Sequence, residues 1–366
     1  MIYLIYLMIL FILAIYEQRN IRFPKFCYWI LLVFLVLLIG LRDGIGADTL
    51  RYIDYYKDVP LINELDKYDF TSTRFQPGFI IVQSICKSIN ENFWFFQMVQ
   101  ALVINVIIFL FIQTNTKYIF TAILFYFTLN YLEFNTEILR ESFSVALGLL
   151  AYHMLKENKK ILYVFLFIIS SFLHISSFII LFYPLLLRIK PTRKSISILI
   201  LVVVSIPLIM PYIQSIESFL ILFSGGQEDL IQSYMDFSSQ QSHNVNYYLV
   251  FFANFVIIPF FFVFITKEKT EKYFGFICAF IVLQLMSSYS YAFYRMANYV
   301  SPFYWLLIAE SVRVLSVKFR LRSFVLSIFL VFFLYSFQRK LFNEDKQEGN
   351  KYMYERYIPY KSVVKF

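Results

Sequence analysis

The sequence is poor in charge, because only 16% of its 366 residues are Asp, Glu, Lys or Arg. Soluble domains carry about a quarter. Hydrophobic residues make up 60% of the chain, including 45 Phe and 29 Tyr. No polar stretch exceeds about 35 residues, so a separate soluble domain is not expected. These shortages exclude a soluble globule and predict an all-α, polytopic integral membrane protein that forms one domain over residues 1–366.

Cysteine and histidine are also scarce, with three residues of each. Cys27, Cys86 and Cys278 lie in or beside apolar runs and lack metal-ligand spacing, which is typical of packing residues. We therefore expect no metal site and no cofactor. The chain has 33 Lys and Arg against 24 Asp and Glu. This excess sets membrane topology and does not indicate nucleic-acid binding, because the bases cluster in short loops.

The positive-inside rule gives an orientation for the chain. The base clusters at 19–25, 156–160, 188–194 and 313–322 are assigned to the cytoplasm, so the outer loops are 42–92 and 214–246. The same count gives about twelve transmembrane helices and places the basic tail 338–366 outside. The expected single spans are 2–16, 26–41, 93–113, 118–132, 138–155, 195–213, 247–266, 273–289, 299–312 and 323–337.

Two apolar runs do not fit a simple crossing. The run 77–89 is short and contains Lys87, so we expect it to be re-entrant or to lie in the interface. The run 161–187 has bases on both sides and would reach roughly 40 Å as one helix, against a hydrocarbon core of about 30 Å. We predict a hairpin of two short helices with residues 171–177 at its tip, which puts His174 in the outer half of the membrane.

Polar residues gather at the expected outer boundary in residues 40–56, which hold three of the nine glycines. Such a cluster at a membrane boundary is a functional-site candidate, although an ordinary solvated loop is the alternative. The topology brings these basic side chains to the same side: Arg42, Arg51, Arg74, Arg140, His174 and Arg295. Arginine forks suit a lipid-linked diphosphate, unless each pairs with a nearby carboxylate or extends to lipid headgroups.

Arg140 and His174 are the most specific candidates. Asn135 or Thr136 is a plausible N-cap with Glu137 in the first turn, and a helix N-terminus beside Arg140 would bind an anion. A Glu137–Arg140 pair at i,i+3 fits equally well. Neutral imidazole at His174 could take a proton from a sugar hydroxyl, or the side chain could be a hydrogen-bonded structural residue. The other two histidines, His153 and His243, are interpreted as incidental.

Several short motifs match one known family in order and spacing. They are Gly40-Leu41-Arg42 with Gly46, Asp48 and Tyr52, then FQPGF at 75–79, Arg140 opening a span, FLHISS at 172–177, and Arg295 with Tyr299. Together they resemble the EpsG family of Wzy-like polysaccharide polymerases. Two positions depart from the family pattern: Gln76 stands where a Glu is expected, and Glu141 where a Gln is expected.

The resemblance implies a metal-independent membrane glycosyltransferase of the bacterial plasma membrane, multi-pass, with its active site facing outward. It would join undecaprenyl-diphosphate-linked oligosaccharide repeat units into a surface polysaccharide such as O-antigen, capsule or exopolysaccharide. The implied catalytic residues are His174, Arg140, Asp48 and Glu141, and the substrate-binding residues are Arg42, Arg51, Tyr52, Arg74, Arg295 and Tyr299. Membrane lipids and the pathway's flippase and chain-length regulator are the other expected partners. A lipid-linked oligosaccharide flippase or transporter and an O-antigen ligase-type transferase remain alternatives.

Overall fold

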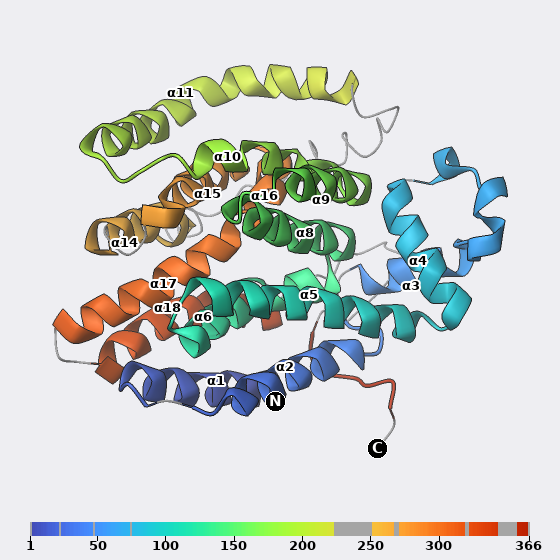
Figure 1. Cartoon of the computed structure of the whole chain (residues 1–366), viewed down its shortest axis with the longest axis horizontal. Helices are drawn as coiled ribbons and strands as arrows, with labels where there is room; N and C mark the ends of the chain where they lie inside the picture. Colours follow the sequence, from blue (N-terminus) through green and yellow to red (C-terminus); the bar gives the residue numbers. More distant parts are fainter. Residues whose placement is uncertain are drawn as a thin grey trace. The chain divides into compact units, whose positions relative to one another are not determined.

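The computed structural model describes residues 2–21, 23–46, 48–73, 75–222, 251–266, 271–318, 322–342 and 357–364. These residues form helices joined by short turns, and no β-strand occurs among them (Figure 1). The expected all-α class is therefore confirmed. By its internal contacts the chain falls into two compact units, one formed by Met1–Ile175 with Val312–Phe366 and the other by Ser176–Ser311.

The first unit contains most of the expected spans as single helices. Its helices are α1 (Ile2–Gln18), α2 (Lys25–Gly40), α3 (Thr49–Asp58), α4 (Pro77–Ile89), α5 (Phe93–Asn115), α6 (Ile119–Tyr126), α7 (Leu132–Thr136), α8 (Leu139–Lys156), α9 (Lys160–Leu173) and α18 (Arg322–Phe342). α8 packs along α9, α2 along α5 and α1 along α6. Helix ends agree with the expected spans within two residues for α1, α2, α5 and α8, because the apolar runs themselves set these lengths.

The segment expected as the outer loop 42–92 is more ordered than a loop. It contains α3, α4 and two short 3-10 helices, η1 (Ile62–Lys67) and η2 (Phe70–Ser72). α4 has the bounds expected from the apolar run 77–89 and packs against α9 and α5. The polar sequence between the spans therefore forms a helical layer rather than open coil.

The expected span 118–132 is a continuous helix with one wide turn. It consists of α6, a π-helix Phe127–Tyr131 (η3) and α7. A buried polar cluster surrounds the wide turn: the Asn135 amide donates to the Tyr131 carbonyl at 2.7 Å and to the Tyr126 hydroxyl at 3.0 Å. Asn105 of α5 donates to the Asn135 carbonyl oxygen at 2.7 Å. These bonds satisfy side chains that would otherwise be unpaired in an apolar interior, and they fix α7 against α5.

The second unit is built around α15. Its described elements are η4 (Ile175–Phe182), α10 (Tyr183–Leu186), α11 (Arg193–Leu222), η5 (Ala253–Ile257, a π-helix), α14 (Ile258–Thr266), α15 (Phe274–Ser287), α16 (Tyr291–Asn298) and the start of α17 (Ser301–Lys318). A Cβ on Gly275 would lie 2.1 Å from the Leu186 carbonyl oxygen, so this glycine allows α10 and α15 to touch. On the other side, Phe276 stacks on Phe303 with ring centroids 4.0 Å apart.

One boundary in the second unit was predicted wrongly. The outer loop was expected to begin at residue 214, but α11 continues to Leu222. Residues 216–222 read Ile-Glu-Ser-Phe-Leu-Ile-Leu, a sequence apolar enough to extend the helix beyond the proline at 211. The remainder of that expected loop, from 223 to 246, lies outside the described residues.

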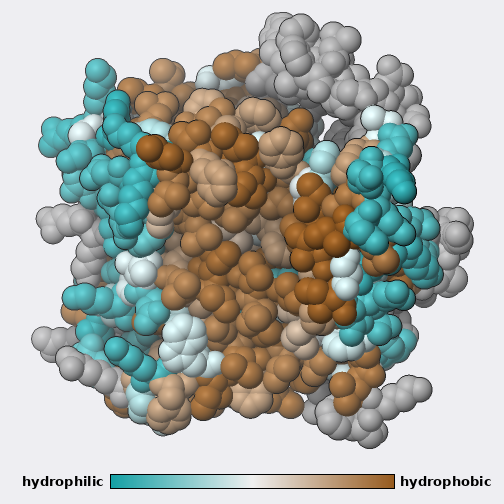
Figure 2. Space-filling model, turned by 45° about the vertical axis from the view of Figure 1, so that its right-hand side comes forward, coloured by the Kyte–Doolittle hydropathy of each residue, from teal (hydrophilic) through white to brown (hydrophobic). Residues whose placement is uncertain are grey.

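Large apolar side chains are exposed along several helices, among them Ile5, Met8 and Ile12 of α1 and Val33 and Phe34 of α2. On the face drawn in Figure 2, hydrophobic side chains gather in the middle and hydrophilic ones lie on both sides of them. Among the described residues, α5 alone is long and apolar enough to cross a membrane as one straight helix, and the pair α16 and α17, bent by 61°, would be a second span. Other apolar helices are shorter, so the count of about twelve spans stays a prediction.

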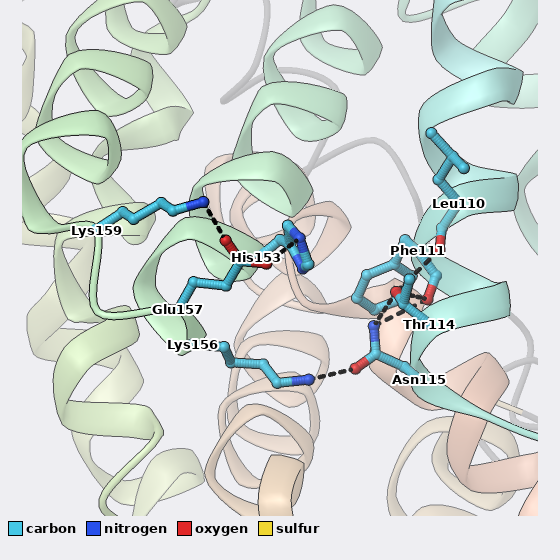
Figure 3. A network of polar contacts seen from close by, with 8 residues as sticks. All are labelled: Leu110, Phe111, Thr114, Asn115, His153, Lys156, Glu157 and Lys159. Carbon is cyan, nitrogen blue, oxygen red and sulfur yellow. Dashed lines mark hydrogen bonds and ion pairs between the residues drawn. The ribbon is translucent and has the colours of Figure 1, made fainter.

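Side-chain contacts divide the helix termini of the first unit into two ends. The first end, which we call the lysine end, joins α1, α5, α6, α8 and α17. Its contacts run from Lys156 to the Asn115 side chain at 3.1 Å, from Arg313 to the Gln18 carbonyl at 2.6 Å, and from the Thr121 backbone to Glu17 at 2.9 Å. Figure 3 shows the Lys156–Asn115 contact beside His153 and Glu157. Every one of these residues lies next to a segment assigned to the cytoplasm from its sequence.

The second end, which we call the arginine end, holds Arg42, Glu137, Arg140 and His174 where α2, α7, α8 and α9 meet their connecting turns. Its contacts likewise join segments assigned to one common side, in this case the outside. The two ends thus agree with the relative sidedness expected from the sequence. Which end faces outward stays a prediction.

Candidate functional site at the arginine end

Two glycines form the turn that follows α2. Gly44 and Gly46 have φ angles of +61° and +108°, which side-chain-bearing residues rarely adopt. A Cβ on Gly46 would also lie 2.6 Å from the Cβ of Thr136, the last residue of α7. The Thr49 hydroxyl bonds the Ile45 carbonyl at 2.6 Å and the Thr136 carbonyl at 3.3 Å. The glycine signature seen in the sequence therefore serves a close contact between this turn and α7.

Arg42 lies inside this turn and is only 1% exposed. Its Nε donates to the Ile45 carbonyl at 3.2 Å and its Nη1 to the Ile39 carbonyl at 2.9 Å. Nη2 is buried without a hydrogen-bond partner in the described parts of the chain. No carboxylate there pairs with this guanidinium, so the expected alternative of an Arg42 ion pair is not observed.

Burial is the main influence on the charge of Arg42. It lowers the pKa of the guanidinium to about 10, while the nearby hydroxyls of Tyr3, Tyr131 and Tyr360 act in the opposite direction. The side chain is therefore still cationic at neutral pH. A buried cation that is bonded only to carbonyl oxygens keeps most of its attraction for an anion.

α5 supports the turn from below through Gln97, a residue that the sequence did not single out. Its buried amide donates to the Gly40 carbonyl at 2.9 Å and to the Arg42 carbonyl at 2.8 Å. A Cβ on Gly40 would lie 2.5 Å from the Met98 sulfur. A polar residue within an otherwise apolar helix was the only sequence signal for this contact.

The C-terminal segment Tyr357–Val364 lies against the same turn, which the sequence did not predict. The Asp43 N–H donates to the Lys361 carbonyl at 3.0 Å, and the Val363 N–H donates to the Leu41 carbonyl at 2.9 Å. These two bonds flank an antiparallel bridge between Arg42 and Ser362. The end of the tail thus shares a side with the segment that follows α2, in agreement with the topological count.

Two tyrosines of this segment extend its contacts. The Tyr360 hydroxyl donates to the Leu38 carbonyl at 3.0 Å, and its ring packs edge-to-face on Tyr3. The buried Tyr357 donates a short hydrogen bond to Oε1 of Glu137. The segment therefore touches both the turn of Arg42 and the residues that precede α8.

Arg140 is the second residue of α8, so it stands at a helix N-terminus as expected. The expected caps are wrong, because Asn135 and Thr136 form the last turn of α7 and the N-cap is Ile138. The Thr136 hydroxyl bonds back to Leu132 at 2.7 Å, which is how a threonine behaves within a helix. The wide π turn lengthens α6–α7 beyond the expected end of the span and moves the helix break past these polar residues.

The guanidinium of Arg140 has an amide partner and an aromatic partner in the FQPGF motif. Nη1 donates to Oε1 of Gln76 at 3.0 Å, and the guanidinium lies over the Phe75 ring with its carbon 4.6 Å from the centroid. Gln76 is the position where the family pattern has an acid. Here it orients the arginine without neutralising it.

Tyr52 continues this aromatic wall. Its ring is 5% exposed, stacks on Phe75 at 5.9 Å and meets the edge of Phe79. Its hydroxyl donates to the Glu137 carbonyl at 3.3 Å. Tyr52 therefore links α3 to the turn before α8, and it acts here through its neighbours.

His174 ends α9 as its C-cap, so the helix break expected within 171–177 is observed. The side chain is 2% exposed. One turn earlier, Ser170 is linked to Ser144 of α8 by hydroxyl contacts of 2.6 to 3.0 Å. Since α8 and α9 are antiparallel neighbours, Arg140, one turn before Ser144, and His174, one turn after Ser170, lie at the same end of the pair.

Close packing brings a further motif to His174. A Cβ on Gly78 would lie 2.7 Å from the carbonyl oxygen of Phe172, so the start of α4 touches the end of α9 directly. The motifs FQPGF and FLHISS are therefore neighbours. Together with the turn of Arg42, they form a site drawn from four separate stretches of sequence.

The two candidate acids differ in environment. Asp48 is the N-cap of α3 and pairs with Arg51 at 3.5 Å, and both side chains are more than a third exposed. Glu141 lies in the first turn of α8 and is 1% exposed. Arg51 thus matches the paired alternative considered for single arginines, whereas Glu141 is embedded behind Arg140.

The remaining candidates are not placed at this end. Arg295 and Tyr299 belong to the second unit, at the last turn and C-cap of α16. There the Arg295 guanidinium lies 5.1 Å from the centre of the Tyr291 ring, and the Tyr299 carbonyl accepts a bond from Tyr183 at 3.0 Å. Arg74 lies outside the described residues.

Apolar helices with exposed hydrophobic faces, ending in a cluster of cationic side chains, define a membrane protein equipped to bind an anionic group. A family model matches residues 25–362, nearly the whole chain, and the protein belongs to the EpsG family, which is related to the Wzy-like polymerases. Membership connects the protein with polysaccharide biosynthesis at a membrane. No curated protein sequence and no solved structure matches the chain.

Proposed function

We propose that this protein polymerises oligosaccharide repeat units carried on undecaprenyl diphosphate at the outer face of the plasma membrane. The observation that carries the proposal is the convergence of Arg42, Arg140 and His174 at one end of the first unit. They come from separate sequence motifs that also define the family. A cationic site at a helix end is suited to a diphosphate, the charged part of such a substrate.

The proposed reaction is a glycosyl transfer. A hydroxyl of the incoming unit attacks the anomeric carbon of the growing chain, a carbon–oxygen bond forms, and the bond from that carbon to the diphosphate oxygen breaks. The hydroxyl proton passes to a base, and the lipid diphosphate leaves with its electron pair. An oxocarbenium-like transition state and a developing diphosphate charge both gain from fixed charges in a site that excludes water.

We assign the roles by geometry. Arg140, held by Gln76 and stacked on Phe75, would bind the leaving diphosphate beside the first N–H groups of α8. His174, at the end of α9, would take the hydroxyl proton or, in the alternative role, donate to the diphosphate. Glu141 is suited to hold a neighbouring group in place. Arg74 and Arg295 remain proposed diphosphate ligands on sequence grounds.

Arg42 has a distinct place in this scheme. Its Nε and Nη1 hold the turn after α2, and only Nη2 is left for a substrate oxygen. One remaining donor on a buried cation can still bind an anion strongly. Arg42 would thus contribute a single bond, and Arg140 the full fork.

The orientation is also part of the proposal. About twelve spans with the arginine end outside satisfy the positive-inside rule, and the contacts at both ends of the first unit are compatible with it. Single cysteines at Lys159 and Asp66, in a background without Cys27, Cys86 and Cys278, would report this. A membrane-impermeant maleimide should label the second from outside and the first only after permeabilisation.

Deletion of the gene tests the function itself. Loss of a polymerase should leave single repeat units on the cell surface, whereas loss of a flippase should leave none. Loss of a ligase-type transferase should leave long polymer still attached to its lipid. Purified protein supplied with lipid-linked repeat units should lengthen them without any acceptor other than a second unit.

A further inference from the structure

The C-terminal segment Tyr357–Val364 occupies the one side of Arg42 that the helices leave open. Helix α5 reaches the turn of Arg42 through Gln97, and α7 reaches it through Thr136. The segment then closes the turn by the bridge between Arg42 and Ser362. Arg42 is 1% exposed as a result.

This closed arrangement leaves a polar group unsatisfied. Nη2 of Arg42 is buried without a hydrogen-bond partner in the described residues, and no carboxylate there balances the charge. A buried donor that has lost water and gained nothing disfavours the state that contains it. An anion at Nη2, or solvent after the segment moves away, would each remove that penalty.

The segment itself is held by few and separable contacts. Two backbone hydrogen bonds join it to Leu41 and Asp43, and two tyrosine hydroxyls bond the Leu38 carbonyl and Glu137. Lys361, Val363 and Val364 are exposed. No apolar core residue of the segment other than the Tyr357 ring is buried. Such a segment can detach without disturbing the helices beneath it.

From these contacts we infer that Tyr357–Val364 is a movable cover over an anion site centred on Arg42, and that a diphosphate and the cover compete for this residue. The inference rests on the proposed function for the identity of the anion, a lipid-linked diphosphate. Free inorganic pyrophosphate shares its chemistry and serves as the probe. In the covered state Arg42 is unavailable, and in the uncovered state Nη2 and the turn face the substrate.

The cover also connects the two arginines. Tyr357 bonds Glu137, which stands three residues before Arg140, while Ser362 lies opposite Arg42. Departure of the segment would free Glu137 and Arg42 together. Both halves of the diphosphate site would therefore open in one step.

A reversible crosslink tests the cover. Asp43 and Lys361 face each other across the antiparallel bridge, and opposed residues in such a pair have Cα atoms about 5.5 Å apart, the usual spacing of a disulfide. The full-length protein with Asp43→Cys and Lys361→Cys, in a background without the natural cysteines, should form this disulfide under mild oxidant. Its polymer-forming rate should fall at least about tenfold when oxidised and return on reduction.

Each outcome has a defined meaning. The single variants Asp43→Cys and Lys361→Cys, treated with the same oxidant, should keep the reduced rate. Full activity of the oxidised double variant, with the crosslink verified by mobility on a gel, would overturn the cover. Failure of the two cysteines to crosslink would also overturn it, because they would then not be neighbours.

A second measurement does not depend on polymerase activity. Ser362→Cys, alone in the cysteine-free background, should react slowly with maleimide while the cover is closed. Saturating inorganic pyrophosphate should raise the labelling rate about threefold or more, and sodium chloride of equal ionic strength should not. An unchanged rate would overturn the competition. If the protein polymerises nothing but pyrophosphate still speeds labelling, the proposed function fails and the cover stands.

Discussion

The two ends of the first unit carry similar numbers of charged side chains but treat them differently. At the lysine end, charges meet partners at the surface: Lys159 and His153 both pair with Glu157, at 2.5 and 3.0 Å. Lys159 lowers the pKa of the Glu157 carboxyl, as expected of an exposed pair. Such pairs contribute little to stability and serve mainly to keep a loop in water.

At the arginine end, cations are withdrawn from water without acids to match them. Arg42 bonds carbonyl oxygens, and Arg140 bonds the Gln76 amide and covers an aromatic ring. Burying a charge without a counter-charge is unfavourable unless it is put to use. The difference indicates that the lysine end reflects topology, whereas the arginine end reflects binding.

The two histidines make the sharpest contrast between the ends. His174→Gln should lower the polymer-forming rate by roughly 10²-fold or more, since glutamine keeps a hydrogen-bonding side chain but cannot accept the proton. His153→Gln, at the lysine end, should change the rate less than about twofold, because its side chain is 40% exposed and pairs only with Glu157. The rate is measured with lipid-linked repeat units in membranes that contain equal amounts of protein.

The pH profile of the same assay separates the two roles of His174. A general base must be neutral, so the rate should rise with pH through the pKa of the base. A cationic donor to the diphosphate would make it fall over that range. Near-normal turnover by well-folded His174→Gln would assign the residue to packing and leave Glu141 as the candidate base.

The glycine turn at the arginine end should be the most sensitive backbone position. Gly46→Ala is expected to destabilise the protein by about 2–4 kcal/mol, because it combines an unfavourable φ with a collision at Thr136. Gly44→Ala, where the nearest atom to a Cβ is 3.6 Å away, should lose only about 1–2 kcal/mol. The midpoint of thermal unfolding in detergent measures both, and equal shifts would contradict a special role for the Gly46–Thr136 contact.

Arginine geometry should matter at one end and not at the other. Arg140→Lys keeps the charge but loses the fork and much of the contact with Phe75, so we expect the rate to fall about 10- to 100-fold. Arg313→Lys, which removes bonds to Gln18 and Asn20 at the lysine end, should stay within about twofold. Similar losses for both variants would remove the distinction between the ends.

The smallest effect is expected for Asp48→Asn. The Asp48–Arg51 pair is long and partly exposed, so its loss should change stability by less than about 0.5 kcal/mol. If Asp48 serves only as the partner of Arg51, turnover should also change less than about twofold. A much larger loss of turnover with unchanged unfolding would restore Asp48 to the catalytic group and extend the site along α3.

Features set by local sequence were predicted well. Apolar runs gave the bounds of α4 and nearly those of α5 and α8, because run length limits helix length directly. The break at His174 followed from the length of its apolar run and the bases that flank it. The motifs at Arg42, Arg140 and His174 were expected on one side of the membrane, and they do lie at one end of the first unit.

Features set by distant sequence were missed. The contact of Tyr357 with Glu137 joins residues 220 positions apart, and that of Tyr360 with Leu38 joins residues 322 apart, so no local pattern announces either. Thr136 was taken for an N-cap because threonine is common at both helix ends and caps. Tyrosines within a basic tail were the only sequence hint that the segment Tyr357–Val364 packs against the protein.

The wide turn at Phe127–Tyr131 makes the arginine end sensitive to the length of the chain. A π turn is equivalent to one extra residue inserted into an α-helix. Deleting any residue of 127–131 would let the helix close normally, shortening it by about 1.5 Å and rotating everything beyond it by about 100°. Thr136 would then turn away from Gly46, although no residue of the site had been substituted. Relatives of this protein should therefore vary in amino acid identity along this turn far more readily than in residue number.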